Sequence, residues 1–418
     1  MVEPSTISNP EGSAALFGAV VCVVGIDYAP DSTGIAPYTT AFARALAEAG
    51  ADVRVVTGIP HYPQWRVTDQ RYLHGRRWSE VIDGIRVIRV RHHVPEVAGL
   101  VGRARMEESF LRRALPVVRR TAADAVVAVT PSLAGLVAGV LGRRGAPLGV
   151  IVQDITGAGA HESGTTGRMV GGLIGEVELA ALRRASLVGV IAPRFGDRLV
   201  EHGVAKSRVV DLMNFTHISP SSIDKVSARR RLGWATDGTV ALHTGNMGMK
   251  QGLETVVEAA AMAPEGLQLV LLGDGNQRRL LEELGRGVGR LSILDPVDDM
   301  SYPLALAAAD VLLLTERPGV REMSLPSKLT SYVAARRPIV AAVEPGGITY
   351  SLLDGAGAAE IVPAGDAGGL LSAVETVTSR PERAAELVAA GEVLAEDLWS
   401  PGAAAERYRA FAARLLGT

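Results

Sequence analysis

The stretch that decides the fold is Thr239-Val-Ala-Leu-His-Thr-Gly-Asn-Met-Gly-Met-Lys-Gln-Gly252. It begins as an apolar run, passes into a glycine-rich turn and continues into a helical pattern, after which a second apolar run follows at Leu267–Leu272. Strand, helix and strand in this order form a βαβ unit, whose two strands lie parallel in one sheet. The same alternation recurs along most of the chain, so the sequence predicts an α/β protein with parallel sheets.

The apolar runs are rich in Val and Ile and do not alternate with polar residues, which indicates strands covered on both faces. In the first half, the predicted strands are Ala19–Gly25, Asp52–Thr57, Ile85–Val90, Ala125–Val129, Leu148–Val152 and Leu187–Ile191. In the second half, they are Thr239–Thr244, Leu267–Leu272, Leu291–Leu294, Val311–Leu314, Ile339–Val343 and Glu360–Val362. Predicted helices include Ala36–Ala49, Arg103–Arg120, Met169–Ala185 and Pro401–Leu416, and Pro116 is expected to kink the second of these or to end it early.

A polar connector around Met213–Arg229 interrupts the alternation and separates two α/β units of about 200 residues each. We predict a flexible leader over 1–17, a Rossmann-like domain over 18–213, a second one over 214–396, and a final helix within 397–418 that packs back on the first domain. Two doubly wound domains of this kind face each other across a cleft, and ligands bind at the carboxyl ends of their strands.

Composition excludes several classes of protein. The 418 residues include 43 Lys and Arg against 45 Asp and Glu, and a formal charge of −2 argues against a protein that binds nucleic acid through its phosphates. The single cysteine, Cys22, excludes an intrachain disulfide and a cysteine metal cluster. No apolar run reaches the ~18 residues of a membrane span, and the N-terminus lacks the basic region of a signal peptide. We therefore expect a cytoplasmic protein.

Two loops of the second half suit a diphosphate. In Gly245–Gly252, glycines allow close approach of a ligand, and Lys250 adds a cation beside a helix start. Pro326, Ser327 and Lys328 begin another helix with free N–H groups and a second cation. The two lysines would clamp one diphosphate; the alternative is an ordinary capped helix with a solvated Lys328. Gly273–Arg278 lacks the last glycine of the dinucleotide fingerprint, which disfavours an NAD enzyme.

The loops of the first half carry weaker signals. Ser32, Thr33 and Gly34 precede a helix and could present N–H groups to an anion, although a long capped loop explains them equally well. Polar and aromatic residues that follow predicted strands suit a sugar ring or an acceptor: His61, Tyr62, Trp65, Gln153 and Asp154. No histidine cluster has the spacing of metal ligands, so we predict no metal.

The helix Arg103–Arg120 is basic and amphipathic. Such a helix could contact an anionic membrane surface from the cytoplasmic side. A solvated helix face is the simpler interpretation, and we favour it.

The chain resembles the retaining glycosyltransferases of family 4, which have the GT-B fold, and in particular their colanic-acid, WcaI-like branch. The resemblance runs from about Ala19 to the C-terminus. It is carried by Gly25-Ile-Asp-Tyr-Ala-Pro30 with Thr33-Gly34, Gly58-Ile-Pro-His-Tyr-Pro63, Gly245-Asn-Met-Gly-Met-Lys-Gln-Gly252, Leu271-Leu-Gly-Asp-Gly275 and Leu325-Pro-Ser-Lys-Leu-Thr-Ser331.

This resemblance implies transfer of a sugar from a UDP-, GDP- or dTDP-sugar, held mainly by the second domain, to a hydroxyl of a lipid-linked saccharide or a soluble small molecule in the first. It implies no metal and no further cofactor. The implied catalytic residues are Lys250, Glu322 and Lys328. The implied donor-binding residues are Gly34, Gly245, Asn246, Gly248, Pro296, Val297, Pro326, Ser327 and Ser331.

Four positions depart from the family pattern. Met323 and Ser331 stand where the family commonly has two glutamates, and Glu322 is displaced by one residue. Asn246 replaces the usual arginine, and Gln153 replaces a frequent histidine. Two other functions therefore stay open, a nucleotide-sugar 2-epimerase of the same architecture and a non-catalytic nucleotide-sugar binder. An epimerase would convert the donor without an acceptor, and a binder would show no turnover.

Overall fold

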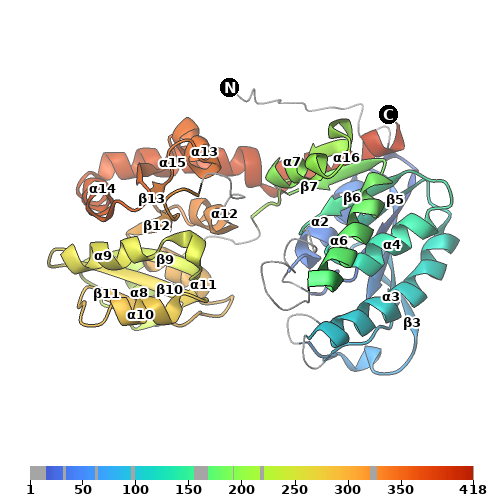
Figure 1. Ribbon diagram of the computed structural model, residues 1–418, viewed down its shortest axis with the longest axis horizontal. Coiled ribbons are helices and arrows are strands. Elements are labelled where there is room, and N and C mark those ends of the chain that lie inside the picture. Colours follow the sequence, from blue (N-terminus) through green and yellow to red (C-terminus); the bar gives the residue numbers. More distant parts are fainter. Residues whose placement is uncertain are drawn as a thin grey trace. The chain divides into compact units, whose positions relative to one another are not determined.

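The computed structural model divides the chain into two compact units (Figure 1). Unit 1 comprises Met1–Asn214 and Pro401–Thr418, and unit 2 comprises Phe215–Ser400. The structure describes residues 16–31, 34–61, 65–95, 99–154, 168–191, 193–216, 221–320 and 327–417. The chain returns to unit 1 after Ser400, and not at the predicted 396/397 boundary, because the preceding helix continues to Trp399.

Unit 1 is built on an eight-stranded sheet of order β3-β4-β2-β1-β5-β6-β7-β8. Its strands are β1 (Val20–Val24), β2 (Asp52–Gly58), β3 (Arg77–Ile82), β4 (Ile85–Val90), β5 (Ala125–Val129), β6 (Leu148–Val152), β7 (Leu187–Val190) and β8 (Val209–Asp211). Its helices are α2 (Ala36–Glu48), α3 (Leu100–Thr121), α4 (Leu133–Gly142), α6 (Arg168–Arg183), α7 (Pro193–Glu201) and α16 (Pro401–Leu416), with short 3-10 helices η1 (Gln70–Tyr72) and η2 (Lys206–Arg208).

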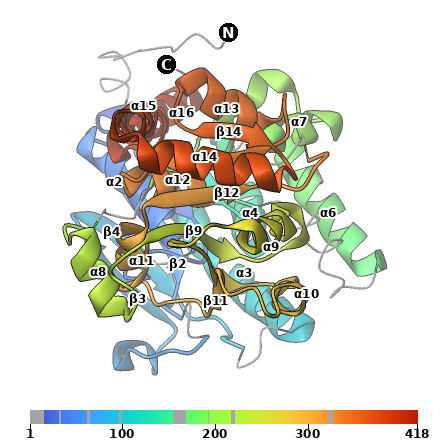
Figure 2. The same ribbon diagram turned by 90° about the vertical axis from the view of Figure 1, so that its left-hand side faces the viewer.

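Alternate residues of β6 show how the two faces of this sheet are covered. Leu148 and Val150 point into a core shared with α3 and α4, whereas Gly149 faces α16. A Cβ at Gly149 would lie 2.8 Å from Leu415, so the glycine lets α16 approach the sheet. Because successive side chains of a strand point to opposite faces, α3 and α4 cover one face and α16 the other (Figure 1, Figure 2).

Aromatic side chains pack α16 against α2 of unit 1. Tyr408 and Phe411 pack edge-on against Phe42 of α2, with ring centroids 5.3 and 6.2 Å away. The predicted return of the C-terminal helix to the first domain is therefore confirmed.

Unit 2 has a six-stranded parallel sheet of order β11-β10-β9-β12-β13-β14. Its strands are β9 (Thr239–Asn246), β10 (Leu267–Asp274), β11 (Leu291–Leu294), β12 (Val311–Thr315), β13 (Ile339–Val343) and β14 (Glu360–Pro363). Its helices are α8 (Lys225–Leu232), α9 (Glu254–Met262), α10 (Arg278–Leu284), α11 (Tyr302–Ala308), α12 (Ser327–Ala334), α13 (Ile348–Ala356), α14 (Ala367–Ser379) and α15 (Pro381–Trp399), with the 3-10 helix η3 (Met249–Gln251).

Both sheets are doubly wound. In unit 2 the strands follow in sequence order outward from the β9/β12 pair. In unit 1 they do so outward from the β1/β5 pair, except that β4 lies inside the edge strand β3. These pairs are the topological switch points, beside which ligands of such sheets bind. One core packs α9 and α14 on the unit 2 sheet, and a second core packs α11, α12 and α15. The predicted fold class, two doubly wound Rossmann-like domains, is confirmed.

The structure differs from the sequence-based predictions in three places. β3 pairs antiparallel with β4 at the edge of the unit 1 sheet and was not predicted, nor was the short β8. Pro116 does not end its helix early, because α3 continues to Thr121. Pro116 is exposed, so water can satisfy the backbone carbonyl that loses its hydrogen bond. Among the described helices, none combines the length and the apolar character required to cross a membrane.

Candidate active site

Beside the switch point of unit 2, the ends of β9 and its neighbour β10 lie close together. Asn246, at the end of β9, pairs with Asp274, at the end of β10, and the N–H of Met247 donates to the Asp274 carbonyl over 2.8 Å. A Cβ on Gly273 would lie 1.9 Å from the carbonyl oxygen of Gly245. Only glycine therefore permits this approach, which explains the residue at position 273.

Lys250 follows β9 in η3, and its backbone is fixed to the end of β12. Its carbonyl accepts a hydrogen bond from the Arg317 N–H over 2.9 Å, and the neighbouring Gln251 carbonyl accepts one from Thr315 Oγ1 over 2.7 Å. The Lys250 side chain is exposed and makes no ion pair with any residue that the structure describes. An ordered loop thus presents a cation without a counter-ion beside the switch point.

Lys328 lies in the first turn of α12, and its ammonium is 2.9 Å from Nε2 of His243. His243 belongs to β9 and is fully buried, which holds its pKa well below the usual value and keeps the ring neutral. Burial also lowers the pKa of Lys328 to about 7. Lys328 is therefore not the solvated lysine of the alternative interpretation; it is a partly buried amine whose charge a bound anion would stabilise.

The remaining predicted donor residues are spread around this site. Pro296 and Val297 follow β11, and the preceding Asp295 pairs with Arg278 over 2.7 Å. The Arg278 guanidinium also donates to the Gly273 carbonyl over 3.0 Å, so the residue that breaks the dinucleotide fingerprint ties two loops together. Ser331 is buried in the second turn of α12, away from solvent. Glu322 and Pro326 lie outside the described residues, and Ser327 begins α12.

In unit 1, the loop after β1 is held rigidly. The Ile26 carbonyl accepts hydrogen bonds from the Gly58 N–H and from Thr57 Oγ1, each over 3.0 Å. The buried Arg89 donates to the Ala29 carbonyl. Gly34 is exposed just before α2 and has φ 66°, a left-handed conformation that favours glycine.

Asp27, Asp31 and His61 come together at the switch point of unit 1. One ligand atom of each residue lies within 4.8 Å of the others. Burial, together with the carboxylates of Asp31 and Glu107, raises the pKa of Asp27 to about 7. His61 is 4 % exposed and its Nδ1 is 3.1 Å from the Ile59 carbonyl. This arrangement could hold a metal ion or another cation.

The structure gives packing roles to two other predicted residues. Trp65 lies between the His61 ring, 5.8 Å away, and the Arg103 guanidinium, 5.7 Å from its centroid. The Gln153 amide is paired in both directions with the amide of Asn214, over 3.1 and 2.8 Å. Asp154 is exposed beyond β6, and Tyr62 lies outside the described residues.

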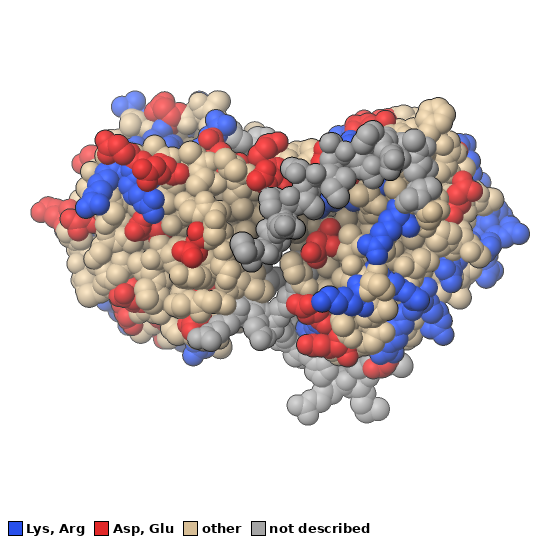
Figure 3. All heavy atoms as spheres, turned by 90° about the horizontal axis from the view of Figure 1, so that it is seen from above, with Lys and Arg blue, Asp and Glu red and all other residues tan. Residues whose placement is uncertain are grey.

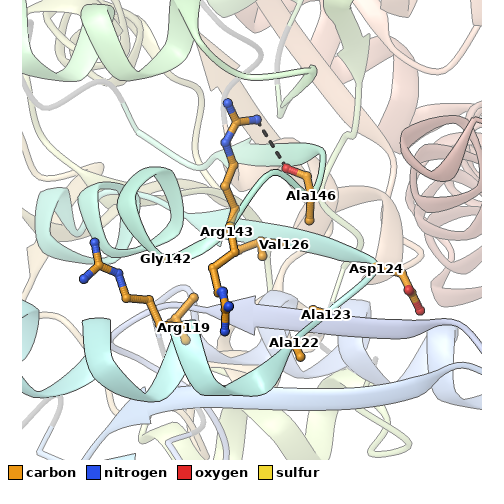
Figure 4. Close-up of a pocket in the computed structure, with 10 residues that line it drawn as sticks. Arg119, Ala122, Ala123, Asp124, Val126, Gly142, Arg143 and Ala146 are labelled. Atoms are coloured by element: carbon orange, nitrogen blue, oxygen red, sulfur yellow. Dashed lines mark hydrogen bonds between the residues drawn. The ribbon is translucent and has the colours of Figure 1, made fainter.

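A hollow of about 330 Å³ lies elsewhere on unit 1 (Figure 4). It is lined by the C-terminal parts of α3 and α4 and by Asp124, which directly precedes β5. This is the amino end of the sheet, opposite to the end where ligands of doubly wound sheets bind. We therefore do not assign the active site to this hollow.

Sequence reasoning missed three residues that the structure brings to the sites. Asp27 lies inside a motif that was quoted for the family resemblance without a role for this residue, and His243 lies inside a predicted strand. Glu316 directly follows β12 and accepts a hydrogen bond from Thr349 over 2.6 Å. Burial raises the pKa of Glu316. Asp27 and Glu316 share a signal that could have found them, because each is an acid just beyond the carboxyl end of an apolar strand.

Comparison with known proteins first defines the class. HepE from Anabaena, solved in complex with UDP-glucose, superposes with a TM-score of 0.62 at 16 % identity and covers 93 % of this chain and 98 % of its own. The shared fold is GT-B, the two-domain architecture of many glycosyltransferases.

The sequence comparisons then show which glycosyltransferases the chain resembles. Residues 33–214 match the glycosyl transferase 4-like domain. WcaI of Escherichia coli (strain K12), assigned to colanic acid biosynthesis as a glycosyl transferase, is 28 % identical over 75 % of this chain and 81 % of its own length. The 2-deoxystreptamine glucosyltransferase of Streptomyces kanamyceticus is 28 % identical over 67 % of this chain and 73 % of its own. The chain is a glycosyltransferase of the GT-B fold that carries a glycosyl transferase 4-like domain.

Proposed function

We propose that this glycosyltransferase moves a sugar from a nucleotide-diphosphate sugar to an acceptor hydroxyl, with retention of configuration and without a metal ion or other cofactor. The observation that carries the proposal is Lys250, an exposed cation on an ordered glycine-rich turn at the switch point of unit 2. The UDP-glucose bound by HepE, which shares the fold, supports this class of donor. The base and the sugar are left open among UDP-, GDP- and dTDP-sugars.

In the proposed reaction, the bond from the sugar to the diphosphate breaks while the acceptor oxygen bonds on the same face. The acceptor proton passes to the leaving phosphate. Lys250, Lys328 and the N–H groups at the start of α12 would stabilise the charge that develops on the diphosphate. Glu322 would contact the donor sugar, and the turn that contains Asn246 and Gly248 would surround the phosphates.

The acceptor would bind to unit 1 beside its own switch point. The names of the two relatives concern an exopolysaccharide and 2-deoxystreptamine, so a lipid-linked saccharide and a soluble cyclitol are both candidates. A lipid-linked acceptor would require unit 1 to reach a membrane from the cytoplasm. The exposed arginines of α3 suit anionic lipids. On the face drawn in Figure 3, which is not the α3 side, unit 1 carries Lys and Arg side chains together with Asp and Glu.

The test compares Lys250→Ala with Lys206→Ala, since Lys206 is an exposed lysine of η2 in unit 1. We expect Lys250→Ala to lower kcat by about 10²- to 10³-fold and to weaken UDP binding, because the leaving diphosphate loses a preorganised cation. Both variants should unfold at the wild-type temperature, because neither side chain is buried.

Wild-type turnover in Lys250→Ala would refute the assignment of this site. Full activity in excess EDTA is expected, and loss of activity that Mg²⁺ or Mn²⁺ restores would refute the metal-free proposal. Incubating the donor without an acceptor and following its anomeric and C2 proton signals by NMR separates transfer from 2-epimerisation.

A further inference from the structure

Asp27 lies with Asp31 and His61 in one group (the cation group below), and its carboxylate has no positively charged partner among the described residues. Asp27 is partly buried, and in the described part of the chain no N–H or O–H group donates to its carboxylate. The charges that shift its pKa are those of acids, and none is a Lys or an Arg. A buried carboxylate without a counter-ion or a donor is costly in free energy. Its neighbours Asp31 and Glu107 add to that cost, because they are acids as well.

The histidines at this site do not supply the missing positive charge. His61 packs against the buried His92, with ring centroids 4.7 Å apart. Burial lowers the pKa of His61 and lowers that of His92 to about 4, so both rings are neutral at pH 7. Nδ1 of His61 is hydrogen-bonded to the Ile59 carbonyl, which can only accept a hydrogen bond, so Nδ1 carries the proton. Nε2 of the neutral ring is therefore an acceptor. Within the described residues, Nε2 makes no hydrogen bond, although the ring is 4 % exposed.

The backbone at Asp27 and the His61 ring are held by hydrogen bonds within unit 1. Asp27 follows Ile26, whose carbonyl is bonded to the end of β2, and His61 is tied to Ile59. Glu107 is engaged separately at the start of α4, where it accepts hydrogen bonds from Ser132 Oγ and the Ala134 N–H. Among the described residues, the Asp27 carboxylate and Nε2 of His61 therefore remain available as acceptors beside β1, a strand of the unit 1 switch point.

We infer that the cation group binds a primary ammonium of the acceptor, so that the acceptor is an amino-substituted cyclitol or sugar. An ammonium donates three hydrogen bonds of about 2.8 Å, and acceptors placed around it lie about 4.6 Å apart. The atoms of the cation group fall within 4.8 Å of one another, which accommodates this arrangement. The inference rests on the proposed function, in which unit 1 holds the acceptor. The aminocyclitol named in the 2-deoxystreptamine glucosyltransferase supports the same acceptor class.

The inference also predicts how binding depends on pH. Asp27 must be ionised to pair with an ammonium, and its pKa is raised to about 7. Affinity for an amine should therefore increase as the pH rises through 7, and it should fall again when the amine itself loses its proton. Asp31, Glu107 and the two neutral histidines face the same site, and a bound ammonium would lower the pKa of Asp27.

The experiment measures calorimetric binding of 2-deoxystreptamine and glucosamine to the full chain, beside their hydroxyl counterparts myo-inositol and glucose, without nucleotide. We expect at least one amine to bind about 10-fold or more tightly than its counterpart. Asp27→Asn should remove that preference, and Glu108→Gln, which changes an exposed carboxylate of α3, should keep it. Asp27→Asn should also leave UDP binding and the unfolding temperature at or above their wild-type values.

Three outcomes would overturn the inference. The first is equal binding of amines and their hydroxyl counterparts. The second is an amine preference that survives Asp27→Asn. The third is binding of Mg²⁺, Mn²⁺ or Zn²⁺ to EDTA-treated protein that Asp27→Asn abolishes, which would make the cation group a metal site. UDP binding and its dependence on Lys250 are measured separately. None of these three results would therefore count for or against the proposed donor site.

Discussion

The two switch points have the same topology and opposite charge. In unit 2, the ends of β9 and β12 carry Lys250, with Lys328 nearby on α12. In unit 1, the loops beyond β1 and β2 carry Asp27, Asp31 and His61. Topology therefore decides where each unit can bind a ligand, whereas the side chains decide which ligand. A basic site fits a diphosphate, and an acidic site fits an amine.

Buried charges away from these sites behave differently, because each unit pairs them. Arg229 of unit 2 is 1 % exposed and reaches Asp310 over 2.5 Å, and Arg89 of unit 1, also 1 % exposed, reaches Glu80 over 2.9 Å. Neither Asp27 nor Lys250 has such a partner among the described residues. Paired buried charges should thus contribute to stability, whereas Asp27 and the exposed Lys250 should contribute to binding.

The strongest test of this contrast is Asp310→Ala. Asp310 also accepts hydrogen bonds from Lys225 and from the Val240 N–H, and its loss leaves the buried Arg229 guanidinium unpaired. We expect the free energy of unfolding to fall by about 3–5 kcal/mol, measured by urea denaturation. Asp83→Ala is the control, since its ion pair with Arg44 is half-exposed and contributes about 0–1 kcal/mol. Equal losses in the two variants would contradict the contrast.

A smaller effect is expected from the glycines at the two sites. Gly273→Ala would drive a Cβ into the Gly245 carbonyl, and we expect a loss of about 1–3 kcal/mol in stability together with weaker UDP binding. Gly25→Ala is the matched change in unit 1, where the nearest atom, Val129 Cβ, is 3.4 Å away. That variant should keep nearly wild-type stability. A stable Gly273→Ala protein with normal UDP affinity would show that the close approach of the two turns is dispensable.

The smallest effect concerns the pH dependence of UDP binding. Burial lowers the pKa of Lys328 to about 7, so the free protein loses this charge as the pH rises from 7 to 9. The diphosphate is already fully ionised in that range. If a bound diphosphate holds the lysine protonated, the Kd should rise with a slope approaching tenfold per pH unit, about 1.4 kcal/mol.

Calorimetry in two buffers of different ionisation enthalpy would detect the accompanying uptake of a proton. Lys328→Met should bind UDP more weakly and show a flat pH profile. A flat profile in the wild type would mean that Lys328 does not exchange a proton when UDP binds.

The sequence predicted the buried strands because strands covered on both faces are continuous apolar runs, as in Ala125–Val129 and Ile339–Val343. It did not predict β3, whose residues Arg77–Ile82 alternate between exposed and half-buried at a sheet edge and include Arg, Ser and Glu. Apolar character alone therefore identifies central strands and misses edge strands.

The candidate sites were predictable only in part. Lys250 could be found because a glycine-rich turn after a strand is a local pattern. The contact of Lys328 with His243 joins residues that are far apart in the sequence, and burial of the lysine follows from how α12 packs on β9. The same reason hid the cation group, since only the pairing of β1 with β2 brings Asp27 beside His61.

The return of α16 to unit 1 has a consequence for how the protein is made. Phe411 and Leu415 fill the space above Gly149 in a sheet whose other strands leave the ribosome early. The core on that face stays open until all of unit 2 has been synthesised, which at ~5–20 residues per second takes roughly ten seconds or longer. Unit 1 is thus completed only after unit 2 has been synthesised, so removal of α16 should leave this face of the N-terminal sheet uncovered.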